Sequence, residues 1–512
     1  MRKLLLAAVA LAAMPAIAQL TPSEAAGRRI YQEGVSGSGH EISAQVGMGG
    51  ATLPGTAVAC GNCHGADGLG RAEAGVDPSV ITWSQLTKSY GHVHANGRRH
   101  PAYDDASFAR VVSAGMDPGG NRLEPAMPRY ALHPDDLRDL LAYMKRLERD
   151  LDAGVSDRAI TIGTLLPAAA PAVGEAMKKA MEAAFQDVNA AGGLYGRRIE
   201  LVARSYAPDA ALQAARDLVE RDHVFALVSP FALGTEPALA RFAEEGRIPV
   251  IGPFTIRGPA SPPGRYTFYL FGGVPEQAEV LVSFGQRNAE LSRQALAIVH
   301  PDDADSGTAA QAALARCHAK GCALAASITY HAGVLDAPRI AARCRDSGAA
   351  AVLFLGPAQD LERFAQAAAD AQWFPALLSP GMLAARAIAH LPATFAERLY
   401  LSYPMSPPAA DGANAFDRFA EKHHLSPSNA LPAFSSYLAA SLLVDGLRRT
   451  GRDVSRERLV QQLESTTDYR TPMAEPLRYG PQRRIGALGG HVVKPAAGTT
   501  SLRAASGWIS LD

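Results

Sequence analysis

The sequence predicts a multidomain fold, with a helical domain over residues 19–150 and an α/β domain over residues 159–512. Apolar residues recur at helical spacing before residue 150, as in Leu137, Leu140 and Met144. From residue 159 onward, short β-rich runs alternate with helical segments, which indicates parallel sheets covered by helices on both faces. The short polar segment 151–158 between these parts is typical of a linker.

The balanced charge of the chain indicates that its function depends on local sites. Lys and Arg total 50 and Asp and Glu total 50, so no strong field favours nucleic acid or an acidic membrane surface, and no nucleic-acid partner is expected. A hydrophobic content of 47% with only 7% aromatic residues fits an Ala-rich helical and α/β protein with sizeable cores.

The first residues are typical of an export signal. Arg2 and Lys3 precede an apolar run over 4–13, and Ala16-Ile17-Ala18 stands before Gln19. The apolar run is too short to span a bilayer. We expect a signal peptide over 1–18, cleaved near Ala18 and Gln19, and a soluble periplasmic protein.

Three helices are expected in the N-terminal domain. They cover residues 27–34, residues 103–114, and a segment that begins beyond His133-Pro134, where Asp135 and Asp136 favour a helix start. The Gly-rich stretch 35–55 is predicted to be irregular.

Cys60-Gly61-Asn62-Cys63-His64 is the most specific motif in the chain. Two thiols at this spacing can add to the vinyl groups of a haem, and the adjoining imidazole can reach the iron. A disulfide or half of a zinc site is the alternative, but zinc needs two further ligands and a disulfide leaves His64 unexplained. The motif predicts one covalently bound haem c, attached at Cys60 and Cys63 with His64 on the iron.

Met127 is the predicted second iron ligand. It lies in Leu123-Glu124-Pro125-Ala126-Met127-Pro128, where the prolines stiffen the backbone that presents the thioether. Met116, in a helix-exit turn, and Met48 are competitors.

His92, His94 and His100 surround Arg98 and Arg99 in a cluster that resembles a metal site. The spacing does not fit one helix face, and no carboxylate or thiolate accompanies it. Polarity of a loop beside the haem propionates is the preferred interpretation.

Residues 24–150 resemble a class I c-type cytochrome domain. The early helix, the haem motif followed by Gly65, Met127-Pro128 and the final helix ending Leu140-Leu141-Ala142-Tyr143-Met144 carry the likeness. The resemblance implies an all-α domain in which His64 is the proximal ligand, Met127 is the distal ligand, and single electrons are transferred. Two strong axial ligands leave no open iron position, which favours electron transfer over oxygen chemistry.

The larger half is predicted to contain repeated strand and helix pairs. Expected helices cover 174–190, 210–221 and 237–245. Expected strands cover 159–165, 198–203, 224–228, 248–251, 295–299, 327–330 and 350–355. Two sheets would bury this many strands, with ligands expected beyond the carboxyl ends of the strands.

This half resembles a type I periplasmic substrate-binding protein of the branched-chain amino acid class, that is, a Leu/Ile/Val-binding-like receptor of an ABC transporter. The likeness rests on residues 160–167, on 183–193, on Gly196-Arg197-Arg198-Ile199-Glu200-Leu201 and on 248–253. It implies a two-lobed α/β domain that closes on a small polar ligand. We expect the lobes to be joined by crossovers near 272–275, near Tyr403 and near 471–477.

The candidate solute pocket uses the loops after two early strands. Its predicted residues are Ser229, Phe231, Thr235, Phe254 and Thr255. The loop that contains Ser229 has an apolar or Gly residue where the family usually has a pocket serine, and Asp302-Asp303-Ala304-Asp305-Ser306-Gly307 lacks the usual Tyr before Gly. These departures disfavour an ordinary α-amino acid, and the aromatic pair suits a smaller, less charged or aromatic solute. Packing between the lobes is the alternative role of Phe231 and Phe254.

Three cysteines remain outside the haem motif. Cys317 and Cys322 would close a short helix-to-strand turn if they formed a disulfide in an oxidising compartment. Cys344, four residues after Ile340 on a helical pattern, is expected to be a buried thiol, although the sequence leaves the pairing open.

Together these features predict a periplasmic electron-transfer protein tethered to a small-solute-binding domain, and no hydrolase or transferase triad stands out. Expected partners are the solute and a periplasmic electron donor or acceptor, such as a dehydrogenase or another cytochrome. The alternative is a transport receptor with a redox-sensing or accessory haem, whose partner would be an ABC permease.

Overall fold

The computed structural model describes residues 20–70, 78–94, 96–207, 209–259, 263–405, 415–425, 429–470, 475–495 and 502–512. The predicted signal peptide, residues 1–18, lies outside these ranges. The chain divides into two compact units, which meet between Asp152 and Ala153.

The N-terminal unit is a small helical domain built around two packed helices. Its helices are α1 (Pro22–Glu33), α2 (Cys60–His64), α3 (Trp83–Leu86), α4 (Asp105–Ala114) and α5 (Pro134–Arg146). Gly27 lets α1 approach α5 closely, because a Cβ there would collide with the carbonyl of Asp139. The helix ends are specified locally: Thr21 and Glu24 form a capping box at α1, and Pro134 begins α5.

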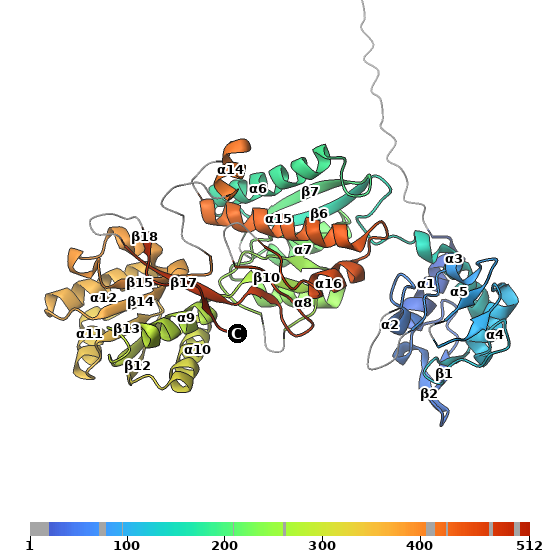
Figure 1. Ribbon diagram of the computed structural model, residues 1–512, viewed down its shortest axis with the longest axis horizontal. Coiled ribbons are helices and arrows are strands. Elements are labelled where there is room, and N and C mark those ends of the chain that lie inside the picture. The colour runs from blue at the N-terminus through green and yellow to red at the C-terminus, as the bar shows by residue number, and fades with distance from the viewer. Residues whose placement is uncertain are drawn as a thin grey trace, which may run out of the picture. The chain divides into compact units, whose positions relative to one another are not determined.

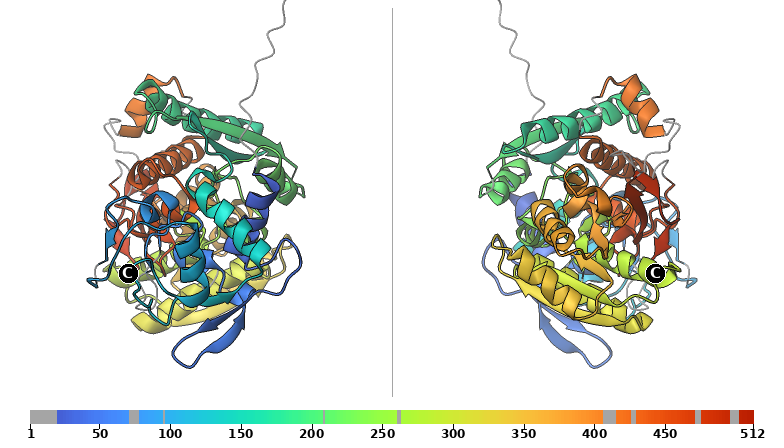
Figure 2. Two further views of the ribbon diagram at one scale, coloured as in Figure 1. Left: turned by 90° about the vertical axis from the view of Figure 1, so that its right-hand side faces the viewer. Right: turned by 90° about the vertical axis from the view of Figure 1, so that its left-hand side faces the viewer.

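The stretch that was predicted to be irregular instead contains a β-hairpin. Strand β1 (Ser43–Val46) pairs antiparallel with β2 (Ala51–Pro54) and with β5 (Arg129–Ala131). Gly47 and Gly50, both with positive φ, form the turn, and the hairpin extends from the helices in both views of Figure 2. The partner β5 lies far away in the sequence, so local composition could not indicate the pairing.

The larger unit consists of two α/β lobes (Figure 1). The first lobe has a six-stranded sheet in the order β16-β10-β9-β8-β6-β7. Its strands are β6 (Ala159–Pro167), β7 (Arg198–Tyr206), β8 (Ala226–Val228), β9 (Val250–Ile251), β10 (Thr267–Phe271) and β16 (Ile485–Ala487). Every pairing among them is parallel, as the alternating pattern predicts.

Helices from distant parts of the sequence cover this sheet. They are α6 (Pro171–Ala190), α7 (Ala211–Glu220), α8 (Glu236–Gly246), α14 (Ala415–Lys422), α15 (Ala430–Thr450) and α16 (Arg456–Glu464). Helix α15 lies beside α6 in Figure 1. Within the described parts of the chain, α15 is the one helix long and apolar enough to span a membrane, and most of it is buried in the core of this lobe.

The second lobe has a larger, mixed sheet. Its strands are β11 (Leu296–Pro301), β12 (Leu324–Tyr330), β13 (Ala351–Phe354), β14 (Ala376–Pro380), β15 (Leu399–Tyr403), β17 (Gly489–Pro495), β18 (Leu502–Ala504) and β19 (Ile509–Ser510). Strands β17, β18 and β19 run antiparallel to their partners. Its helices are α9 (Val274–Arg287), α10 (Ala304–Lys320), α11 (Ala337–Asp346), α12 (Ala358–Asp370) and α13 (Gly381–Ala384).

The chain passes between the lobes at three places. The first passage follows β10 at Gly272–Gly273, and the second follows β15, which ends at Tyr403. The third lies at Leu488, between β16 of the first sheet and β17 of the second. The predicted position, 471–477, is wrong: residues 471–474 lie outside the described residues, and Leu477 packs in the core of the first lobe before β16 joins its sheet.

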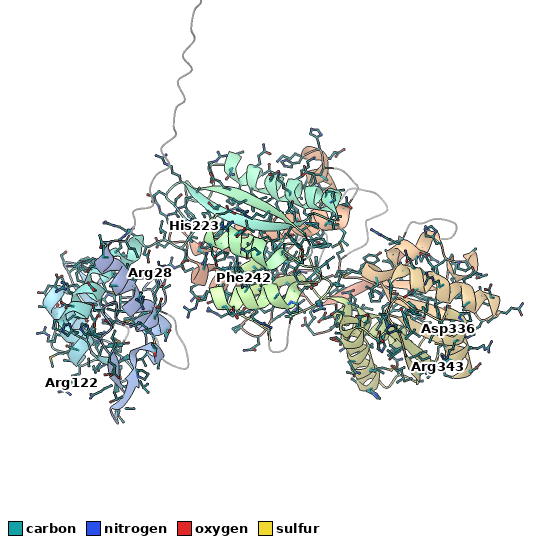
Figure 3. The ribbon with its side chains drawn as sticks, turned by 180° about the vertical axis from the view of Figure 1, so that it is seen from behind. Arg28, Arg122, His223, Phe242, Asp336 and Arg343 are labelled. Atoms are coloured by element: carbon teal, nitrogen blue, oxygen red, sulfur yellow. A yellow bond between two sulfur atoms is a disulfide. The ribbon has the colours of Figure 1, made fainter. Side chains whose placement is uncertain are left out.

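The three cysteines outside the haem motif lie in the second lobe. Cys317 and Cys322 form a disulfide across the turn from α10 toward β12, with their Cα atoms 5.1 Å apart. Cys344 is a free, fully buried thiol on α11, whose position Arg343 and Asp336 mark in Figure 3. Burial raises the pKa of the Cys344 thiol to about 11.

Candidate functional site

The first candidate site is centred on α2, which places Cys60, Cys63 and His64 on one turn and a half of helix. Both cysteines are free thiols, Cys60 half-buried and Cys63 exposed. Burial raises the pKa of Cys60 to about 11, so this thiol stays protonated until it reacts. A thioether bond to haem forms from free thiols, and Cys60 and Cys63 are free because they do not form a disulfide with each other.

A backbone carbonyl group orients the imidazole of His64. Its Nδ1 lies 3.0 Å from the carbonyl oxygen of Ser79, and the residue is only 8% exposed. Burial lowers the pKa of His64, which favours the neutral ring. The carbonyl can only accept a hydrogen bond, so Nδ1 carries the proton and Nε2 keeps its lone pair for an iron atom.

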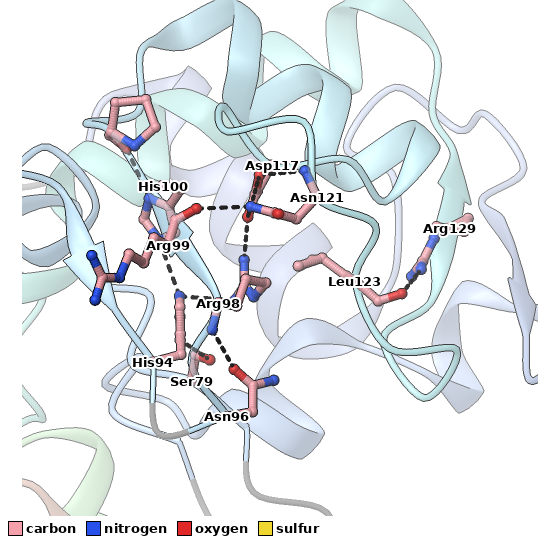
Figure 4. Close-up of polar contacts among 11 residues, drawn as sticks. Ser79, His94, Asn96, Arg98, Arg99, His100, Asp117, Asn121, Leu123 and Arg129 are labelled. Atoms are coloured by element: carbon pink, nitrogen blue, oxygen red, sulfur yellow. Dashed lines mark hydrogen bonds and ion pairs between the residues drawn. The ribbon is translucent and has the colours of Figure 1, made fainter.

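Polar residues behind Ser79 form a connected network (Figure 4). The hydroxyl of Ser79 lies 3.3 Å from Nδ1 of His94, and Nη2 of Arg98 lies 2.8 Å from Nε2 of the same ring. Arg98 also donates through Nη1 to Oδ2 of Asp117 at 2.6 Å.

The histidine cluster is joined by hydrogen bonds. Nε2 of His100 lies 3.0 Å from Nε2 of His94, and the guanidinium of Arg98, which is always positively charged, lies 2.8 Å from the same atom of His94 and would repel a cation there. Among the residues that the structure describes, no group of three or more His, Cys, Asp or Glu side chains could hold a metal ion. The cluster instead supports the segment behind His64.

Met127 lies in the half-buried shell of the domain core, which also contains Cys60. Its backbone is restrained on both sides: its N–H donates to the carbonyl of Glu124 at 3.0 Å, and Arg129 donates to its carbonyl oxygen. Arg129 also donates to the carbonyl of Leu123 at 2.7 Å (Figure 4). By contrast, Met48 is 94% exposed in the hairpin turn, and Met116 lies in a β-bridge with Arg122.

These residues fit a haem c. Two free thiols, an imidazole with an available Nε2 and a thioether on a restrained backbone are the donor types that a covalent, low-spin haem requires. Cys60 and Cys63 would hold its vinyl carbons, and His64 and Met127 its iron.

The second candidate site lies at the carboxyl ends of β8 and β9, where the structure separates the predicted pocket residues. Ser229 is fully buried, and its Oγ lies 2.8 Å from Oγ of Ser436 on α15. Its side chain therefore points into the core of the lobe. Thr235 precedes α8, and its hydroxyl donates to the carbonyl of Ala232 at 3.0 Å.

Phe231 and Phe254 follow the neighbouring strands β8 and β9 and lie together. Their rings stack with centroids 5.7 Å apart, and their backbones form a parallel β-bridge. Both side chains are partly buried and pack against the core of the first lobe.

Glu236 is the residue of this edge that the sequence reasoning missed. It begins α8, is 6% exposed, and accepts a hydrogen bond from Thr255 Oγ1 at 2.9 Å. The sequence does show an acid in the first turn of a helix that follows a strand-end loop, which could have indicated a binding residue. Acids are also common at this position because they interact favourably with the helix dipole, so the signal is not specific.

The loop after β9 reaches the second lobe. Oγ1 of Thr255 accepts a hydrogen bond from the backbone N–H of Arg257 at 2.9 Å. Arg257 Nη2 in turn donates to Asp305 Oδ2 at 2.6 Å, and its Nε lies 2.5 Å from Oδ1. Asp305 is in the first turn of α10, so this edge is where the loops of the two lobes meet.

The fold and the two sites define a two-lobed binding protein that carries a haem domain at its N-terminal side. The family model described as periplasmic binding protein matches residues 159–495, and the model described as cytochrome c matches residues 49–148. The chain belongs to the periplasmic binding protein family and contains a cytochrome c domain. No curated protein matches the chain.

Solved structures agree with the fold of the larger unit. A fatty acid ABC transporter substrate-binding protein from Thermomonospora curvata is 17% identical, with a TM-score of 0.56, over 70% of this chain and 95% of that one. A leucine-binding protein from Thermotoga maritima is 16% identical, with a TM-score of 0.54, over 69% and 99%. A branched-chain amino acid ABC transporter protein with bound valine, from Thermus thermophilus, is 15% identical, with a TM-score of 0.56, over 69% and 97%.

Proposed function

We propose that this protein is a periplasmic electron carrier with a tethered solute-binding domain, and that it serves as a redox partner in a periplasmic oxidation pathway. The observation that carries the proposal is the donor set on α2 and its surroundings: two free thiols, His64 with Nε2 available, and Met127 with a restrained backbone. Haem c, when bound, supplies reversible transfer of single electrons.

The surrounding residues suit an electron carrier better than an enzyme. Ser79 and the network behind it hold the His64 ring in one tautomer, and the bonds from Arg129 limit movement of the Met127 loop. If both His64 and Met127 bound the iron of a haem, no position on that iron would remain for a substrate. We therefore propose that the solute is bound without being chemically changed.

A partner protein that is bound at one domain experiences a high effective concentration of the other domain, because the two domains are fused. Because both domains belong to one chain, the second encounter is intramolecular, so a dehydrogenase that uses or releases the solute would find an electron acceptor on the same chain. The export-type N-terminus and the family of the larger domain support a periplasmic location.

A second candidate is supported by the resemblance of the larger unit to ABC transporter binding proteins. In this version the protein delivers a solute to an ABC permease, and the haem is accessory or senses redox state.

Two strains distinguish the candidates: a deletion of the whole protein, and a Cys60→Ala/Cys63→Ala replacement that keeps the binding domain. A redox partner predicts normal solute uptake and a slowed periplasmic oxidation in both strains. A receptor predicts that uptake is lost in the deletion and persists in the cysteine variant. Normal uptake and normal oxidation in the deletion strain would refute both.

A further inference from the structure

The strongest unexplained feature of the solute-binding domain is the carboxylate of Glu236. Oε1 accepts the hydrogen bond from Thr255, whereas Oε2 is buried and has no hydrogen-bond partner among the described residues. A buried carboxylate oxygen without a partner is costly, and such groups in native proteins usually await a ligand or an ordered water.

The position of Glu236 favours a ligand. It follows the loop after β8, at the edge of a parallel sheet where open α/β folds bind ligands. Its partner Thr255 is bonded to Arg257, and Arg257 pairs with Asp305 of the second lobe. The carboxylate therefore belongs to the edge where the two lobes meet, the place where a closing receptor encloses its solute.

The neighbouring groups do not supply the missing donor. The hydroxyl of Tyr206 already donates to the carbonyl of Phe231 at 2.7 Å. Burial, with a smaller contribution from the negative charge of Glu236, raises the pKa values of Tyr206 and Tyr269 to about 12. Negative charge at this edge would repel a ligand carboxylate and attract a cation.

We propose that Glu236 binds the protonated amino group of a solute whose apolar part contacts Phe231 and Phe254. A cationic N–H group gives Oε2 a charge-assisted hydrogen bond, which is stronger than a neutral one. The aromatic pair adds dispersion and a cation–π contribution. The inference rests on the proposed function that this domain binds a solute, and it narrows that solute to an organic amine.

The test compares head groups on constant apolar bodies, using the full-length holoprotein and isothermal titration calorimetry. One series is benzylamine, benzyl alcohol and benzoate, and another is butylamine, butanol and butyrate, with leucine as an amino acid. Each probe is titrated into the wild-type protein, into Glu236→Gln, and into Glu245→Gln. The last variant removes the same charge from the exposed far end of α8.

The inference expects at least one amine to bind more tightly than its matched alcohol and carboxylate. Glu236→Gln should weaken that amine about 10-fold to 100-fold, the range of a lost charge-assisted bond, and Glu245→Gln should change nothing. Equal thermal unfolding midpoints of the two variants establish that Glu236→Gln is folded.

Two results would overturn the inference in different ways. Preferential binding of benzoate or butyrate by the wild-type protein, or leucine binding that Glu236→Gln leaves unchanged, would refute the amino-group assignment while leaving a solute-binding domain intact. If neither these probes nor a broad panel of periplasmic metabolites produced heat on titration, the proposed solute-binding function would fall and the inference with it.

Discussion

Arg98 and Asp117 form an ion pair in the N-terminal domain, in which the carboxylate is buried and the guanidinium side chain is 17% exposed. Nη1 donates to Oδ2 at 2.6 Å, and the carboxylate has no exposed surface. Burial alone would raise the pKa of Asp117, but hydrogen bonds from Asn121 and from Arg98 hold it below the usual range. The pair joins the His94–His100 segment to the turn after α4.

Replacing Asp117 with Asn should destabilise this domain by about 2 kcal/mol at neutral pH, because the partly exposed guanidinium of Arg98 loses a buried counter-charge. Urea unfolding of the holoprotein, followed through haem absorption, measures the loss. Asp105→Asn is the control, since Asp105 forms an exposed pair with Lys145 and should give little change.

The same variant predicts a pH dependence. A depressed folded-state pKa contributes stability that is complete above the unfolded value of about 3.9 and is lost as pH falls through the folded value. The difference between wild type and Asp117→Asn should be constant from about pH 5 to pH 8 and should shrink below about pH 4. A difference that grew toward low pH would contradict this assignment.

Cys60→Ala/Cys63→Ala should yield protein without covalently attached haem after export in a strain with intact maturation machinery. Haem staining of a denaturing gel measures the attachment. Cys344→Ala removes a buried thiol from the other unit and should leave the stain unchanged. Stain that persisted in the double variant would place the haem elsewhere.

Met127→Ala should abolish the weak long-wavelength sulfur-to-iron absorption band of the oxidised protein and lower its reduction potential, because a thioether ligand raises the potential. Spectroelectrochemistry measures both quantities. Met116→Ala and Met48→Ala should change neither, and the reverse pattern would identify a different methionine as the ligand.

The Arg257–Asp305 pair should couple the two lobes weakly. The side chains are 34% and 40% exposed, so a double-mutant cycle of Arg257→Ala and Asp305→Asn should show about 0.5–1 kcal/mol of coupling in unfolding. At 1 M salt, where the Debye length is about 3 Å, most of this coupling should disappear. A coupling insensitive to salt would mean that packing, and not charge, joins the lobes here.

Local patterns predicted most of the architecture. The strand and helix alternation from residue 159 located β6 to β9 and α6 to α8 closely, because each segment carries its own periodicity. The hairpin β1–β2 and the passage at Leu488 depended on partners far away in the sequence, β5 and β10, and no local pattern contains that information.

The haem motif could be predicted from the sequence because covalent attachment requires fixed residue types at fixed spacing. The residues of the candidate solute pocket were harder to predict from the sequence, because the side chain of a loop residue can point either into the core or toward the pocket. Ser229 turned toward Ser436 in the core, and the informative group was Glu236, whose missing partner is visible only when the hydrogen bonds are placed.

The passage at Leu488 also constrains the order in which the parts of the chain can fold. The N-terminal unit is one continuous segment, whereas the first lobe needs β16 and the second needs β17, both near the end of the polypeptide. If the chain is exported amino end first, as proposed, a complete N-terminal unit would leave the translocation channel while both lobes of the larger unit still lacked a strand. Haem attachment to the proposed ligands could then precede assembly of the two lobes.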